Sequence, residues 1–158
     1  MAFQKIALTM AAPSCLFPAG CGEDTTTEKK AEKAVASTEP LKAAWGYPSP
    51  RADEGWSKQH EEARMLIEQK YGDKIRTQVV DNVTNTVDAE RVIRDLAAQG
   101  NKIIFATSFT YMNPALKVAK EFPDVKFENC TGYKTAANYS NYNARFYQAR
   151  YLAGKLAA

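Results

Sequence analysis

Strand-like and helix-like segments alternate between residues 41 and 130, and this alternation constrains the fold more than any other feature of the sequence. The strand-like runs are LKAAWGY (41–47), KIRTQVVDNV (74–83), KIIFATS (102–108) and DVKFENC (124–130). The third run is short and apolar, which is typical of a strand buried on both faces. Strands that alternate with helices are joined by right-handed crossovers, so the pattern predicts an α/β fold with a doubly wound, mainly parallel sheet.

Helical periodicity is clear in two segments between these runs. In DAERVIRDLAAQG (88–100), apolar residues recur at helical spacing, acidic residues occupy the first turn and Gly100 provides a stop. In NPALKVAKEFP (113–123), Asn113 is the expected N-cap and Pro123 ends the helix. Each segment is therefore expected to pack an apolar stripe on the sheet.

A first helix is expected over residues 56–71, with Ala63, Leu66 and Ile67 on its inner side. The three helices flank a sheet whose predicted strand order is 2-1-3-4. The predicted core residues are Ile93, Leu96, Ile103, Ile104, Phe105 and Val118.

Ligands of parallel α/β sheets bind outside the carboxyl ends of the strands. The loops that follow the four predicted strands carry aromatic and short polar side chains: Asp53, Trp56, Asp81, Asn82, Ser108, Phe109, Tyr111, Tyr133 and Lys134. Aromatic faces stack on flat rings, and a carboxylate accepts from a sugar hydroxyl or a ring N–H. This edge therefore predicts a site for a flat ligand with a polar rim.

Each of these side chains also has a structural interpretation. Trp56 is either a stacking platform or a plug that closes the start of the first helix, and Asp53 either contacts a ligand or caps that helix. Phe109 fits packing, and Tyr133 fits a loop anchor. His60 fits a half-buried structural position better than a ligand contact, because it lies at helical spacing from the apolar side of its helix.

The first 21 residues differ from the rest of the chain. Lys5 precedes a mostly apolar run and small residues before Cys21, which is the layout of a secretory signal. FPAGC (17–21) resembles a bacterial lipoprotein cleavage box, in which the cysteine becomes the lipidated N-terminus. We therefore predict a lipoprotein-type signal peptide over 1–21 with lipidation of Cys21, and a plain secretory signal is the alternative.

Residues 22–40 are rich in Thr, Glu, Lys and Ala and contain no aromatic residue, which predicts a flexible, solvated linker. The folded domain is expected over 41–158. No later segment approaches ~18 consecutive apolar residues, so membrane attachment is predicted through the lipid alone. The expected location is the cell envelope, at the periplasmic or extracellular face of the plasma membrane.

Composition argues against several classes of function. The net charge is +3 and acidic residues are interleaved with basic ones, so no basic stripe for nucleic acid is present. Beyond Cys21, the sequence has one cysteine, Cys130, and one histidine, His60, so neither a disulfide framework nor a metal site is predicted. Cys130 fits a small residue at a strand end. Without a Gly-rich phosphate loop or a GxSxG elbow, no enzyme and no cofactor are predicted.

A family resemblance rests on five stretches of the sequence: DEGWSKQHEEAR, DAERVIRDLAAQG, IIFATSFTYMNPALKVAKEFPDVKFE, TGYKTAAN and YNARFYQARYLAG. Together they resemble the basic membrane protein family, the purine-nucleoside-type substrate-binding lipoproteins of ABC transporters. The resemblance covers almost all of residues 41–158. It implies a type I periplasmic-binding-protein fold, in which two doubly wound lobes hold a nucleoside between them.

The resemblance also implies roles for individual residues and partners. An Asp and an aromatic residue of the first loop contact the ligand in that family, which implies Asp53 and Trp56 here. The loop after the third strand would place Ser108, Phe109 and Tyr111 near the base or the ribose. The implied ligand is a purine nucleoside and the implied protein partners are ABC permease subunits, with no covalent chemistry.

Family members carry a second lobe of comparable size, whereas this chain stops at RYLAGKLAA, in the helix that should lead toward that lobe. The resemblance therefore implies the first lobe only. The alternatives are a sugar- or nucleoside-sensing domain or an enzyme domain on the same fold, and a non-functional fragment. A repressor core is disfavoured, because a signal and a linker stand where a DNA-binding helix pair would precede it.

Overall fold

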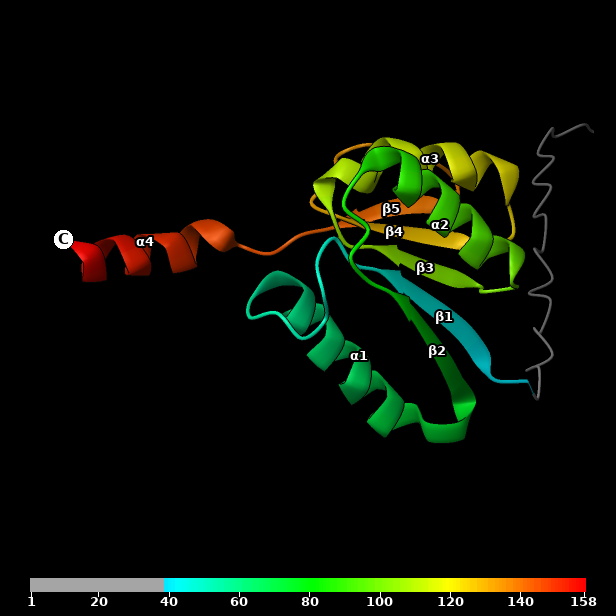
Figure 1. The fold of residues 1–158 in the computed structure, drawn as a ribbon, viewed down its shortest axis with the longest axis horizontal. Coiled ribbons are helices and arrows are strands. Elements are labelled where there is room, and N and C mark those ends of the chain that lie inside the picture. The colour runs from blue at the N-terminus through cyan, green and yellow to red at the C-terminus, as the bar shows by residue number, and fades with distance from the viewer. Residues whose placement is uncertain (1–38) are drawn as a thin grey trace, which may run out of the picture. The chain divides into compact units, whose positions relative to one another are not determined.

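The computed structural model describes residues 39–158. The predicted signal over 1–21, the lipidation of Cys21 and nearly all of the predicted linker lie outside the described residues. The described chain forms one sheet with helices on both faces (Figure 1). The strands are β1 (Leu41–Gly46), β2 (Ile75–Val80), β3 (Ile103–Ala106), β4 (Lys126–Cys130) and β5 (Tyr139–Tyr142). The helices are α1 (Trp56–Tyr71), α2 (Thr86–Ala98), α3 (Met112–Glu121) and α4 (Phe146–Ala157), with 3₁₀ turns η1 (Gly72–Lys74) and η2 (Phe109–Tyr111).

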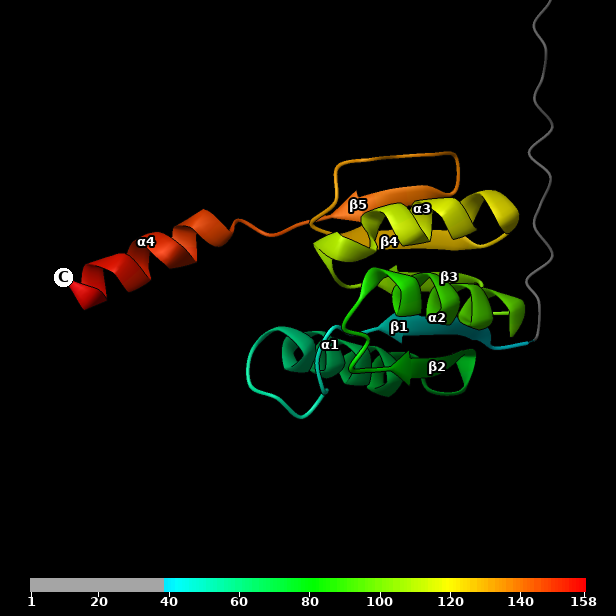
Figure 2. The same cartoon turned by 45° about the horizontal axis from the view of Figure 1, so that its top comes forward.

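The strand order is β2-β1-β3-β4-β5, and all neighbouring strands are parallel. The predicted order of the first four strands is therefore confirmed, and β5 extends the sheet beyond β4. Figure 2 shows α2 and α3 on one side of the sheet and α1 on the other. The doubly wound α/β class predicted from the alternation of segments is thus confirmed.

The face covered by α2 and α3 holds the larger hydrophobic core. The α2 stripe is buried as its spacing predicts, and Asn85 caps the helix by accepting from the Asp88 N–H at 2.8 Å. Gly100 has a φ of +84°, a left-handed conformation that suits glycine just after a helix. Four predicted core residues are fully buried here: Ile93, Leu96, Ile104 and Val118.

The opposite face of β3 is less covered than predicted. Ile103 and Phe105 are only half-buried, so the prediction of a strand buried on both faces is wrong. The reason is that α1 is the only helix on that face within residues 39–158, and its Ile67 packs where Trp45 and Val79 of β1 and β2 lie.

The inner side of α1 also differs from the prediction. The helix has the predicted bounds, but Leu66 is 64% exposed, Ala63 is exposed and only Ser57 is buried. Ile67 packs against the sheet as predicted, and Glu61 and Arg64 add polar contacts with it.

The start of α3 is a second local difference. Asn113 is not the N-cap, because the helix begins at Met112, directly after η2. Ser108 caps η2 by accepting from the Thr110 N–H at 3.4 Å. The Asn113 side chain instead accepts a hydrogen bond from Lys134 Nζ at 2.8 Å.

The C-terminal region continues from β5 into α4, which extends away from the sheet in both views (Figures 1 and 2). The helix predicted in RYLAGKLAA is confirmed, and none of its residues is buried. Within the described part of the chain, the helices are all too short or too polar to cross a membrane.

Candidate ligand-binding site

Hydrogen bonds link the carboxyl ends of β1 and β3, next to the predicted site. Thr107, the first residue after β3, donates through its side chain to the Gly46 carbonyl oxygen at 2.7 Å and through its N–H to the same oxygen at 3.2 Å. The loops after these two strands therefore leave the sheet from one fixed point.

Trp56 is the first residue of α1 and spans from this helix to the loop after β3. Its Nε1 donates to the Thr107 carbonyl oxygen at 2.6 Å, while 37% of the residue remains exposed. Gly55, immediately before it, has a φ of +104°, which explains why a glycine precedes the indole. The indole is therefore held by one hydrogen bond and remains accessible, unlike a buried plug.

Asp53 lies at the exposed tip of the first loop. It does not cap α1, because the N-cap is Gly55 and no side chain caps that terminus. Among residues 39–158 the Asp53 carboxylate has no hydrogen bond or ion pair. The structure therefore leaves this carboxylate accessible.

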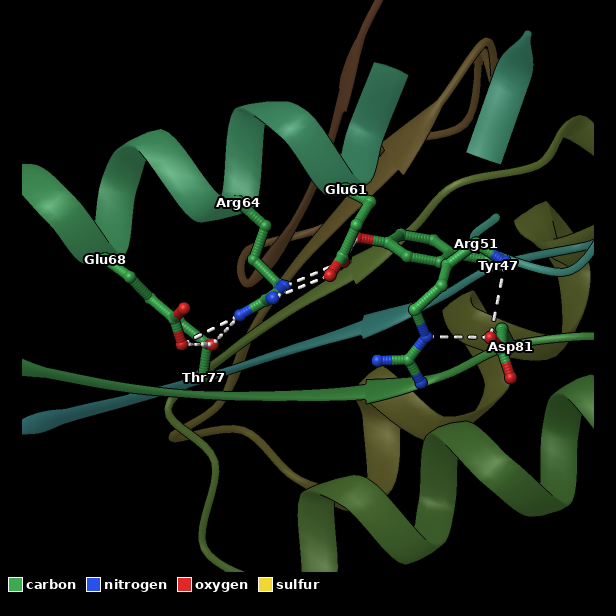
Figure 3. Close-up of polar contacts among 7 residues, drawn as sticks. All are labelled: Tyr47, Arg51, Glu61, Arg64, Glu68, Thr77 and Asp81. Atoms are coloured by element: carbon green, nitrogen blue, oxygen red, sulfur yellow. Dashed lines mark hydrogen bonds and ion pairs between the residues drawn. The ribbon is translucent and has the colours of Figure 1, made fainter. Parts of the chain in front are cut away.

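The first loop is tied to the loop after β2. Arg51 Nε donates to Asp81 Oδ2 at 2.8 Å, and the Arg51 N–H donates to the same atom at 3.3 Å (Figure 3). This bonding holds the pKa of Asp81 below its ordinary value. Asn82 follows in a left-handed conformation, with a φ of +57° that asparagine tolerates, and is exposed. Asp81 is therefore engaged within the protein.

The loop after β3 divides its predicted site residues between surface and core. Ser108 is half-buried, with Oγ 2.9 Å from Thr110 Oγ1. Phe109 is 53% exposed and lies 6.3 Å from the Tyr133 ring, measured between centroids. Tyr111 is 1% exposed, and its hydroxyl donates to the Val83 carbonyl oxygen. Burial raises the pKa of Tyr111, and its position is that of a packing residue.

Asn129 at the end of β4 supports this loop from below. Its Nδ2 donates to the Ala106 carbonyl oxygen at 2.9 Å and to the Ser108 carbonyl oxygen at 2.8 Å. Two residues of the loop after β4 lie near this part of the site. The Tyr133 ring lies next to the Phe109 ring, and Lys134 donates a hydrogen bond to the Asn113 side chain.

A cavity of about 440 Å³ is lined in part by Trp56. Its walls come from α1, the ends of β4 and β5, and the start of α4: Gly55, Trp56, Gln59, His60, Ala63, Cys130, Tyr142, Asn143, Ala144 and Phe146. Cys130 is buried, as expected for a small residue at a strand end. Tyr142 and Phe146 are not among the predicted site residues, although the aromatic run YSNYNARFY (139–147) signals them.

A polar network fixes the inner side of α1 (Figure 3). The Tyr47 hydroxyl donates to Glu61 at 3.1 Å, and Arg64 donates to both Glu61 oxygens at 2.6 and 2.8 Å. Arg64 also pairs with Glu68 at 2.8 Å, and both contact Thr77 of β2. Hydrogen bonds from Arg64 lower the pKa of Glu61. These groups are occupied with one another and position the helix that carries Trp56.

A second cavity, of about 520 Å³, lies between α2 and α3. Its charged lining residues are already paired, because Glu90 contacts Arg94 at 2.8 Å and Lys117 at 2.7 Å. It lacks an aromatic residue, so it does not suit stacking of a flat ligand.

Comparisons with known proteins agree on one family. The family model described as ABC transporter substrate-binding protein PnrA-like matches residues 41–158. The purine-binding protein BAB2_0673 of Brucella abortus (strain 2308) is 53% identical over 125 residues, which is 79% of this chain and 36% of that protein. TsgA13 of Haloferax volcanii, whose name describes glucose binding for an ABC transporter, is 40% identical over 117 residues, or 74% of this chain and 29% of its own length.

A solved structure gives the same result for the fold. An ABC transporter solute-binding protein from Conexibacter woesei DSM 14684 superposes with a TM-score of 0.61 at 26% identity, over 71% of this chain and 38% of that one. The chain thus spans about a third of the length of the relatives it matches. The family model covers nearly the whole described region, and the chain therefore belongs to the PnrA-like family of ABC transporter substrate-binding proteins.

Proposed function

We propose that residues 41–158 form one wall of a purine nucleoside site in a substrate-binding protein of an ABC importer. The observation that carries the proposal is the Trp56 indole, which is fixed through Nε1 to the Thr107 carbonyl oxygen and is still 37% exposed. A flat base stacks on a fixed, accessible aromatic face of this kind. The family match and the name of the Brucella abortus relative support the choice of a purine.

The proposed contacts combine stacking with hydrogen bonding. Trp56 stacks on the base, and the Asp53 carboxylate accepts from a sugar hydroxyl or a ring N–H. Ser108 and Phe109 border the ligand from the loop after β3. Tyr111 is reassigned from ligand contact to support of that loop, because its hydroxyl is bonded to a core carbonyl oxygen.

Sugar capture is the second candidate, and the relatedness to TsgA13 favours it. An exposed carboxylate and an accessible aromatic ring suit sugar hydroxyls as well as a base. Titration of glucose alongside adenosine and guanosine separates the two candidates. Nucleosides recovered unchanged after incubation would support binding without catalysis, whereas a cleaved nucleoside would support the enzyme alternative.

The proposal extends to the partners and the location. The protein would deliver its ligand to permease subunits at the outer face of the plasma membrane, held there by a lipid on Cys21. Labelled fatty acid should be incorporated by the parent chain and by Cys15→Ser, and lost in Cys21→Ser. Labelling that persists in Cys21→Ser would exclude this anchor.

The central experiment measures nucleoside affinity by calorimetry at millimolar ligand, because a single wall is expected to bind weakly. Stacking of a base on an aromatic residue contributes roughly 1–3 kcal/mol, so Trp56→Ala should weaken binding by roughly 5- to 150-fold. Trp56→Phe keeps a ring but lacks the Nε1 donor, and it should lose less. Unchanged affinity in Trp56→Ala, together with a lower unfolding temperature, would show that the indole only packs.

Fluorescence gives an independent readout of the same contact. The sequence has two tryptophans, so Trp45→Phe leaves Trp56 as the only indole. Trp45 stacks on Phe105 with ring centroids 4.6 Å apart, and phenylalanine preserves an aromatic ring there. Saturable quenching of the remaining indole by nucleoside is expected, and quenching that rises linearly without saturation would contradict a defined site.

A further inference from the structure

His60 lies one helical turn after Trp56 and lines the 440 Å³ cavity with it. Three aromatic rings surround its imidazole. The centroid distances are 5.1 Å to Trp56, 6.2 Å to Tyr142 and 6.3 Å to Tyr47. Rings on three sides restrict the rotamers of the imidazole, so its two nitrogens have defined environments.

One of these nitrogens is bonded within the protein. His60 Nδ1 lies 2.8 Å from the Trp56 carbonyl oxygen, and a carbonyl oxygen can only accept, so Nδ1 carries the hydrogen. In the neutral ring the other nitrogen, Nε2, is then an acceptor. Among residues 39–158, Nε2 has no hydrogen-bond partner.

Several other polar atoms on the cavity wall have partners within the protein. Trp56 Nε1 donates to Thr107, Gln59 donates to Glu62 at 3.2 Å, and Asn143 accepts from the Ala144 N–H at 2.9 Å. Burial raises the pKa of the Cys130 thiol. The His60 Nε2 is therefore an acceptor on a wall that also carries the rings of Trp56, Tyr142 and Phe146.

We propose that His60 is a ligand-contacting residue whose Nε2 accepts a hydrogen bond from a base N–H, with the base against Trp56 in this cavity. The inference rests on the proposed function and adds a determinant of specificity to it. The ligand class is a flat nitrogen heterocycle with at least one N–H, and rings in which that position is methylated are rejected.

Two substitutions separate the two nitrogens. His60→Asn can keep a donor near the position of Nδ1 and lacks any group at Nε2, whereas His60→Gln can place an amide oxygen near Nε2 and lacks the Nδ1 bond. The probes are inosine, whose base has a single N–H, and 1-methylinosine, which lacks it. Affinities for both probes are measured by calorimetry on the parent chain and both variants, with unfolding temperatures as the folding control.

The parent chain should prefer inosine over 1-methylinosine by roughly tenfold, the order of one hydrogen bond. His60→Asn should lose most of this preference, and His60→Gln should retain part of it. The opposite pattern, with the preference kept in His60→Asn and lost in His60→Gln, would show that the imidazole acts only by positioning Trp56, and would overturn the proposal.

Other outcomes also decide the question. Equal affinities for the two probes in the parent chain overturn the inference without any substitution, so the test survives a variant that does not fold. Inosine binding that depends on Trp56, with a preference that neither variant changes, overturns the role of His60 and leaves the proposed function standing. A parent chain that binds no purine nucleoside overturns both.

Discussion

The two faces of the sheet are built from different chemistry. On the face covered by α2 and α3, Leu96, Ile104 and Phe127 are at most 1% exposed. On the α1 face, a smaller apolar cluster contacts Ile67, and the Glu61–Arg64 pair with its bond to Tyr47 adds a polar attachment of the helix. Burial of apolar side chains stabilises a fold without requiring a particular direction of contact, whereas hydrogen bonds between charged groups also fix the relative positions of the side chains. We infer that the first face supplies most of the stability and that the second holds Trp56 and His60 in place.

The sharpest test of this difference pairs two leucines. Leu96→Ala on α2 should lower the free energy of unfolding by roughly 2–5 kcal/mol, because the side chain is fully buried. Leu66→Ala on α1 should change it by less than ~0.5 kcal/mol, because Leu66 is 64% exposed. Urea unfolding of both variants makes the comparison, and equal losses would remove the distinction between the faces.

A pH series tests the ionic attachment of α1. Because Arg64 lowers the pKa of Glu61 in the folded state, this carboxylate stabilises the fold fully above its unfolded pKa of about 4.3 and loses that contribution as the pH falls through the folded pKa. The parent should therefore lose more stability than Glu61→Gln on acidification from neutral pH to below pH ~4, by roughly 1.5–3 kcal/mol.

Glu62→Gln is the matched control, since Glu62 is the adjacent, exposed residue of the same helix. It should follow the parent at every pH. Identical acid sensitivity of the parent and Glu61→Gln would mean that the Arg64 pair does not hold α1 to the sheet.

Gly132, in the loop after β4, tests how closely the side chains at the carboxyl edge of the sheet are packed. A Cβ at Gly132 would overlap the Oδ1 atoms of Asn129 and Asn141. Asn129 is buried and donates two hydrogen bonds, so it has little freedom to move. Gly132→Ala should cost roughly 1–3 kcal/mol, as overpacking does. Gly154→Ala in α4, where a Cβ meets nothing within 4 Å, should cause no loss, and equal effects would show that the edge relaxes.

The fold could be predicted where apolar spacing was strong. The α2 stripe around Ile93 and Leu96 identified its helix and its buried side together. Most of the inner side of α1 could not be identified this way, because Glu61 and Arg64 lie half-buried as a pair, whereas each alone looks like a solvated charge in the sequence. Strand β5 was missed because YSNY has no alternation of apolar and polar residues, and its pairing with β4 is a long-range property.

The candidate site was predicted only in part. Ligands of parallel sheets bind at the carboxyl ends of the strands, so the strand order was enough to locate the loops of Asp53, Trp56 and Phe109. The strand order does not show that the Tyr111 side chain turns inward to the Val83 carbonyl oxygen. It also gave no indication of the cavity around His60, which depends on rings contributed by β5 and α4.

Helix α4 has no buried residue within the described chain, and at 12 residues it is near the length at which isolated helices become marginal in water. Its amide protons should exchange with solvent far sooner than those of α2, on which the core closes. Phe146, in its first turn, lies 5.7 Å from the Trp56 ring, measured between centroids. We therefore expect fraying of α4, on the roughly 0.1–1 μs scale of helix–coil relaxation, to loosen this wall of the cavity and to change access to the indole.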